Sequence, residues 1–142
     1  MIGIASDHGG YELKMHILKG LRNISFKDLG TNSLDSVHYP HFADKCCNAI
    51  LHGDVDSGIL ICGTGIGISM RANRYHGIRA ALVHDEFSAK MSKAHNNANI
   101  LCLGGRTTSN ELALHLVQTW MNTPFESGRH QDRIELIDAP IQ

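Results

Sequence analysis

Short apolar runs alternate with amphipathic stretches along the whole chain. The apolar runs are about five residues long and are hydrophobic at consecutive positions, which is the pattern of strands buried on both faces of a parallel sheet. Strands are predicted at Ile2–Ser6, Ser25–Asp28, Gly58–Cys62, Arg79–Val83 and Asn99–Leu103.

The stretches between these runs have helical spacing. In the clearest of them, Leu112, Leu116 and Trp120 recur every four residues and form one apolar row. Thr108 and Glu111 precede that row with the spacing of a capping box. Helices are predicted over Tyr11–Leu21, His41–Leu51, Gly67–Arg74, Phe87–His95, Ser109–Met121 and Gln131–Ile137.

Regular alternation of strands and helices predicts an α/β fold: a doubly wound, Rossmann-like three-layer sandwich around a five-stranded parallel sheet with right-handed crossovers. The length favours a single domain over residues 1–142. If the strand order is flavodoxin-like, 2-1-3-4-5, ligands bind beyond the carboxyl ends of the first and third strands. The loops expected there are 7–10 and 62–67.

The charge balance and the apolar runs exclude several classes of partner. The formal net charge is -1 and the sequence pI is about 6.8, whereas a nucleic-acid binder would show a basic excess. No apolar run approaches the ~20 residues of a membrane helix, and the first residues do not read as a signal peptide. Two of the four cysteines are adjacent and none forms a C-x-x-C pair, which indicates a reduced, cytoplasmic protein.

Histidines are numerous, ten in 142 residues. A zinc site would need clustered cysteine and histidine ligands at short spacings. The nearest approach is His38-x-x-His41, which has no cysteine close by. We therefore expect neither a metal site nor a cofactor.

The segment CGTGIG, residues 62–67, ends the third predicted strand. A tight strand-to-helix turn with a buried cysteine is the plainest interpretation. A dinucleotide fingerprint would need glycine or alanine at position 68, and a cysteine phosphatase would need arginine there. Ile68 occupies that position, so both are excluded.

A third interpretation is a site for an enediolate. A helix N-terminus favours a thiolate, so Cys62 could transfer a proton near neutral pH. The N–H groups of the glycine loop would hold the charge that develops on the substrate oxygens. Without bulky side chains in the loop, substrate can reach both the sulfur and the backbone.

Two further stretches carry candidate chemistry. His95 and Asn96 end a predicted helix, where they could serve as a C-cap, or His95 could serve as an acid/base group. Arg129 and Arg133 lie at a helix start, a placement that opposes the macrodipole unless an anion binds there. Arg106 could join them, because guanidinium groups bind phosphate through paired hydrogen bonds; surface charge is the alternative.

These stretches together resemble the ribose-5-phosphate isomerase B family, which includes isomerases of allose and galactose phosphates. The resemblance runs in order over nearly the whole chain. The motifs are Ser6-Asp7-His8-Gly9-Gly10, Tyr39-Pro40-His41, residues 58–69, Gly77-Ile78-Arg79-Ala80, His95-Asn96, Leu103-Gly104-Gly105-Arg106 and Gly128-Arg129-His130-Gln131-x-Arg133.

The resemblance implies a metal-independent aldose–ketose isomerase of the pentose phosphate pathway, which interconverts ribose 5-phosphate and ribulose 5-phosphate through an enediolate. It makes Cys62 the base and His95 the residue that aids ring opening. Some members use a glutamate as base, but residues 69–72 contain no acid. The implied binding residues are Asp7, His8 and Asn96 for the sugar, the backbone of Gly63, Thr64, Gly65, Ile66 and Gly67 for the enediolate, and Arg106, Arg129 and Arg133 for phosphate.

Two alternatives stay open: an isomerase of a 6-phosphohexose such as allose 6-phosphate, and a non-catalytic phosphosugar-binding module. Sheet geometry adds an expectation about assembly. Cys62 ends a strand whereas His95 precedes one, so the sheet separates them by roughly 17 Å. We therefore expect a two-fold homodimer, or a dimer of such dimers, in which each active site takes Cys62 from one chain and His95 from the other.

Overall fold

The computed structural model describes residues 1–142 and contains every predicted element, with ends that lie within two residues of the expected positions. The strands are β1 (Ile2–Ser6), β2 (Phe26–Asp28), β3 (Ser57–Cys62), β4 (Ala80–Leu82) and β5 (Ile100–Gly104). The helices are α1 (Tyr11–Gly20), α2 (Tyr39–Leu51), α3 (Ile66–Ala72), α4 (Glu86–Ala94), α5 (Asn110–Asn122) and α6 (Arg129–Asp138).

All five strands are parallel, in the order β2-β1-β3-β5-β4. The flavodoxin-like order was wrong in one respect, because β5 lies between β3 and β4. Burial explains the difference: every residue of β5 is buried, as a central strand requires, whereas β4 is short and only half-buried, as suits an edge. The change of direction between β1 and β3 remains, so the predicted position for a ligand is kept.

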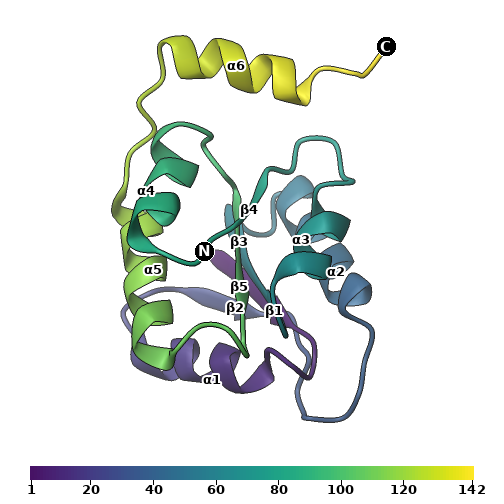
Figure 1. Cartoon of the computed structure of the whole chain (residues 1–142). Helices are drawn as coiled ribbons and strands as arrows, with labels where there is room; N and C mark the ends of the chain where they lie inside the picture. The colour runs from purple at the N-terminus through teal and green to yellow at the C-terminus, as the bar shows by residue number, and fades with distance from the viewer.

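Two layers of helices cover the sheet (Figure 1). One apolar core joins the sheet to α1, α4 and α5 and includes the fully buried Trp120 and Leu116. The other joins it to α2 and α3 and includes Phe42 and Cys46. In Figure 1, α6 stands apart, above the edge at which the strands begin. No helix combines the length and apolar character needed to cross a bilayer.

The start of α5 differs from the predicted capping box. Ser109, not Thr108, is the N-cap, and its side chain accepts a hydrogen bond from the Leu112 N–H. Ser109 has the extended backbone that an N-cap residue adopts, because the helix begins one residue later than the box assumed. The Thr108 hydroxyl is buried without a partner.

A buried cation fixes the chain after β2. Lys14 has no exposed side chain, and its Nζ donates to Asp28 Oδ1 and to the Thr31 carbonyl, both at 2.6 Å. Asp28 in turn accepts from the Gly30 N–H at 3.0 Å. Lys14 therefore joins α1 to the end of β2 and to the segment that leads toward the carboxyl edge of the sheet.

Lys14→Ala should lower the free energy of unfolding by about 2 kcal/mol. Removing one partner of a buried ion pair costs about 3–5 kcal/mol, and the partial exposure of Asp28 reduces that cost. The exposed Lys19→Ala, in the same helix, should change it by less than about 0.5 kcal/mol. Urea unfolding of both variants measures the difference; equal losses would contradict a structural role for Lys14.

Candidate functional site

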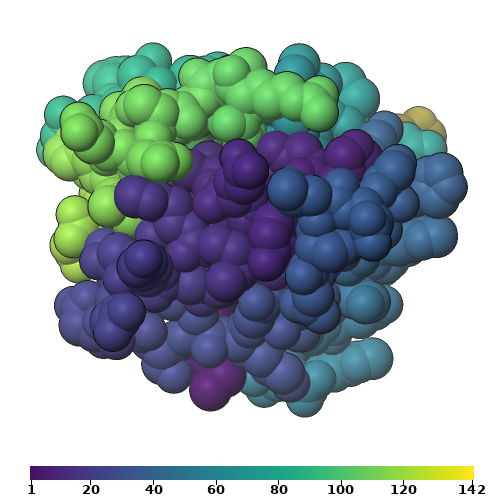
Figure 2. Space-filling view, turned by 90° about the horizontal axis from the view of Figure 1, so that it is seen from below, coloured from purple at the N-terminus to yellow at the C-terminus, as the bar shows by residue number.

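The carboxyl ends of β1, β3 and β5 bring three loops together. Asp7 follows β1, Cys62 ends β3, and Arg106 follows β5. A Cβ on Gly105 would collide with the Gly9 carbonyl, so these two loops meet backbone to backbone. Figure 2 shows this face from below, with the purple segment of the first loop between green and blue segments of the later chain.

Cys62 is held at the mouth of the glycine loop. Its Sγ accepts a hydrogen bond from the Gly65 N–H at 3.1 Å, and the side chain is buried. Gly65 has a φ of 79°, a backbone conformation that favours glycine, and a Cβ there would lie 2.6 Å from Leu82 Cδ1. The loop therefore needs glycine at this position in order to direct an N–H group at the sulfur.

The other cysteines lie deeper in the apolar core to which Cys62 also belongs. Cys46, Cys47 and Cys102 are fully buried within the core under α2 and α3. Burial raises the pKa of Cys46 and of Cys47 to about 12, and it raises the pKa of Cys102 as well. These three thiols are therefore protonated at neutral pH and take no part in proton transfer.

The glycine loop leaves several backbone donors free. The Ile66 N–H donates to Thr64 Oγ1 at 3.2 Å, while the N–H groups of Gly63, Thr64 and Gly67 donate to no atom of the chain. Of the five N–H groups predicted to hold an enediolate, two are thus occupied and three are available. These three donors come from the same loop as Cys62 and suit a substrate that develops negative charge on oxygen.

Asp7 and His8 border the same loop. Asp7 is buried, and its Oδ1 accepts from the Gly10 N–H at 3.1 Å. His8 Nδ1 accepts from the Val37 N–H at 3.2 Å. Because Nδ1 is an acceptor, the proton of neutral His8 lies on Nε2, which can donate a hydrogen bond to a ligand.

A second group of predicted residues lies at the opposite edge of the sheet. His95 is the C-cap of α4 and Asn96 follows it, before β5 begins, whereas Cys62 pairs with Gly104 where β5 ends. The length of β5 therefore separates His95 from Cys62, by roughly 17 Å. Arg129 and Arg133 belong to α6 and lie on the His95 side, since the ring of His130 stacks on that of His95.

The three candidate phosphate ligands are exposed, and no carboxylate pairs with any of them. Arg106 lies against the glycine loop, because a Cβ on Gly63 would be 3.2 Å from its Nη1. Arg129 is the first residue of α6, where a cation opposes the helix dipole. Unpaired guanidinium groups at these positions suit an anionic ligand.

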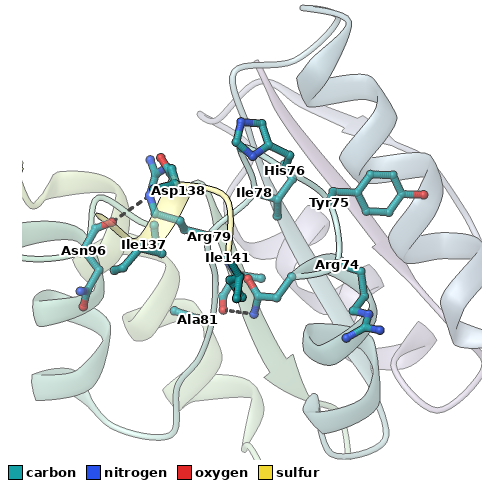
Figure 3. Close-up of a pocket in the computed structure, with 15 residues that line it drawn as sticks. Arg74, Tyr75, His76, Ile78, Arg79, Ala81, Asn96, Ile137, Asp138 and Ile141 are labelled. Carbon is teal, nitrogen blue, oxygen red and sulfur yellow. Dashed lines mark hydrogen bonds and ion pairs between the residues drawn. The ribbon is translucent and has the colours of Figure 1, made fainter. Parts of the chain in front are cut away.

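A cavity of about 540 Å³ opens on the His95 edge, beside the C-terminal segment (Figure 3). Asn96 lines it, but Cys62 does not. Arg79 organises one wall: it pairs with Asp138 at 2.8 Å and donates to the carbonyls of Asn96 and Asn97, both at 3.1 Å. The cavity thus adjoins one half of the predicted site only.

Sequence reasoning missed two neighbours of His95. Glu126 and His130 offer ligand atoms that, with His95, lie within 4.8 Å of one another, and two histidines with a carboxylate are a donor set that zinc accepts. However, the two imidazole planes are only 10° apart and stacked, so their lone pairs cannot meet at one ion unless a ring turns. His130 belongs to a quoted motif, whereas Glu126 gave no signal because it lies between predicted helices.

Comparison with known proteins identifies the family. The family model described as Ribose/Galactose Isomerase matches residues 2–137. Ribose-5-phosphate isomerase B of Escherichia coli (strain K12) is 44% identical over 140 residues, which cover 97% of this chain and 94% of that protein.

Solved structures agree with this match. A ribose 5-phosphate isomerase from Thermotoga maritima is 50% identical, with a TM-score of 0.94 and 96% of each chain covered. Ribose-5-phosphate isomerase B from Mycoplasma genitalium, solved with bound ribulose 5-phosphate, is 42% identical, with a TM-score of 0.91 over 96% of this chain and 93% of that one. The chain therefore belongs to the ribose/galactose isomerase family, as its motifs predicted.

Proposed function

We propose that this chain is a ribose-5-phosphate isomerase that interconverts ribose 5-phosphate and ribulose 5-phosphate, with Cys62 as the base. The observation that carries the proposal is the Cys62 sulfur, which accepts the Gly65 N–H in a loop with three further N–H groups free. The relatives named above confirm the predicted enzyme class. The residue roles, the substrate and the assembly that follow are our proposal.

The Cys62 thiolate removes the proton from C2 of the open-chain aldose. Electrons of the C–H bond form the C1–C2 double bond, and negative charge develops on the oxygens of the enediolate. The N–H groups of Gly63, Thr64 and Gly67 stabilise that charge. Cys62 then returns the proton to C1, the remaining hydroxyl proton passes from O2 to O1, and the ketose is formed.

The remaining residues bind and prepare the sugar. Asp7 and His8 border the loop of Cys62 and contact the hydroxyl groups, while Asn96 contacts the sugar from the other edge. His95 aids opening of the furanose ring. The phosphate is bound by Arg106, Arg129 and Arg133. It provides these guanidinium groups with the anionic partner that no carboxylate of the chain provides.

A second copy of the chain completes the site. Within one chain, Cys62, Asp7, His8 and Arg106 lie at one edge of the sheet, and His95, Asn96, Arg129 and Arg133 lie at the other. In a two-fold dimer each site combines one edge from each chain. Arg129 and Arg133 then enter the site with His95. The four free cysteines support the cytoplasmic location expected from the sequence.

Conversion of ribose 5-phosphate to ribulose 5-phosphate should be measurable directly, and faster than conversion of allose 6-phosphate. EDTA should not change the rate, because none of the proposed steps uses a metal. The assay compares both sugars at equal concentration with and without EDTA. Turnover of allose 6-phosphate alone would redirect the proposal to hexoses, and turnover of neither sugar would favour a binding module.

Cys62→Ala should lose about 10²–10⁴-fold in turnover, the usual contribution of a general base. Cys102→Ala should instead lower the melting temperature and keep turnover, because its thiol is fully buried in the core. Steady-state kinetics and thermal unfolding of both variants separate the two roles. Near-normal turnover of folded Cys62→Ala would rule out this base.

Mixing Cys62→Ala with His95→Asn should restore activity if the site is shared. The mixture is dissociated, reassociated and assayed with ribose 5-phosphate at high enzyme concentration, where uncatalysed ring opening limits His95→Asn. Random pairing gives about half heterodimers, each with one intact site, so about a quarter of normal activity should return. Heterodimers that form by mass but remain inactive would show that both residues act within one chain.

A further inference from the structure

Two side chains that the proposed mechanism does not use surround His95. Glu126 Oε1 lies 3.6 Å from Nε2 of His95 and 3.6 Å from Nε2 of His130. The two imidazole rings stack with their centroids 4.1 Å apart. The side chain of His95 is 38% exposed, whereas that of His130 is only 9% exposed, so His130 forms a fixed backing for a ring that faces solvent.

The backbone holds Glu126 beside His95. The Glu126 N–H donates to the carbonyl of Ala94, the residue before His95, at 2.9 Å. The chain then turns through Ser127 and Gly128, both with φ near 60°, and α6 begins at Arg129. A serine in this left-handed region costs free energy, and the turn brings His130 over the His95 ring.

The segment on the other side of His95 is fixed as well. Asn97 has a φ of 44°, and its carbonyl and that of Asn96 both accept from Arg79. Arg79 also pairs with Asp138 at the end of α6 (Figure 3). The backbone on both sides of His95 is thus fixed. The orientation and the tautomer of its ring therefore depend on the neighbouring side chains.

A histidine that assists ring opening needs one nitrogen free to accept a proton. Such a tautomer is set by the partner of the other nitrogen, because a carboxylate there keeps its N–H. In this chain Glu126 Oε1 lies 3.6 Å from Nε2, too far for a direct hydrogen bond but close enough for its charge to favour a proton on that nitrogen. Nδ1 is then left as the acceptor. The charged form of His130 is disfavoured: burial, with smaller effects of His95 and Arg129 and an opposing effect of Glu126, lowers its pKa.

We propose that Glu126, with His130 stacked behind the ring, is a positioning residue that holds His95 in the tautomer whose Nδ1 accepts the proton of the anomeric hydroxyl. As that proton leaves O1, the O1–H electrons form the C1 carbonyl and the C1–O4 bond breaks. O4 takes a proton from water, and the imidazolium releases its proton to solvent. This inference rests on the proposed role of His95 in ring opening.

The two directions of the reaction separate ring opening from enolisation. Ribose 5-phosphate closes its ring through O4, whereas ribulose 5-phosphate has its O5 phosphorylated and stays open. An enzyme that cannot open the ring depends on aldehyde formed spontaneously in solution. Its rate from ribose 5-phosphate therefore stops rising with enzyme concentration, while its rate from ribulose 5-phosphate remains proportional to enzyme.

Glu126→Ala should open the ring about 10- to 100-fold more slowly than the unmodified protein, the loss expected when a partner that orients a histidine is removed. Its rate from ribose 5-phosphate should fall by that factor and still rise with enzyme concentration, while its rate from ribulose 5-phosphate stays unchanged. Glu126→Gln keeps an accepting oxygen and should recover part of the rate. Glu86→Ala is the matched control, because Glu86 lies 3.5 Å from His115 in an exposed pair outside the site. It should behave like the unmodified protein in both directions.

Two further measurements separate the role of Glu126 from the role of His95. Glu126→Ala combined with His95→Asn should be no worse than His95→Asn alone, and nitrogen-15 spectra should show more Nδ1–H tautomer of His95 in Glu126→Ala. Equal losses in both directions for Glu126→Ala, or none, would overturn the inference while His95→Asn shows the plateau. If His95→Asn shows no plateau, the role of His95 itself is wrong and the inference fails with it.

Discussion

The close approach of backbone at the carboxyl edge of the sheet is the constraint on which the site depends. A Cβ on Gly10 would lie 2.5 Å from the Ile61 carbonyl oxygen, and one on Gly105 would collide with the Gly9 carbonyl. The loops after β1, β3 and β5 are therefore packed without side chains between them. This packing leaves Cys62 beside bare N–H groups, and it makes the site a property of three loops together.

One apolar core holds all four cysteines, but Cys62 also contacts the glycine loop. In the core beneath α2 and α3, thiols are surrounded by apolar groups, and burial holds the pKa of Cys46 and of Cys47 at about 12. Cys62 is the last residue of β3, and its Sγ accepts a hydrogen bond from the Gly65 N–H in the loop that follows. Contact with an N–H group of the glycine loop, and not residue type, thus separates the candidate base from the three thiols that lie deeper in the core.

The sequence predicted most of this arrangement, because the signals that matter are local. Hydrophobic periodicity located every strand and helix, and the motifs placed Asp7, Cys62 and Arg106 at one edge of the sheet. Local periodicity could not predict that β5 lies beside β3. The order of strands depends on how the helices pack on the sheet, and this packing leaves β4 at the edge. Glu126 was also missed: its relation to His95 arises from a turn with unusual backbone angles and a single hydrogen bond to Ala94.

The separation of Cys62 from His95 by the length of β5 has a consequence for gene duplication. In the two-fold dimer proposed above, two copies of such a chain need only one intact carboxyl edge and one intact opposite edge between them. One copy can therefore lose the cysteine loop and the other can lose the histidine, and one complete site per pair survives. In each copy, the residues of the edge that is no longer needed can then be substituted without loss of the original reaction. Such substitutions can lead to binding of a new sugar or to regulation of the partner.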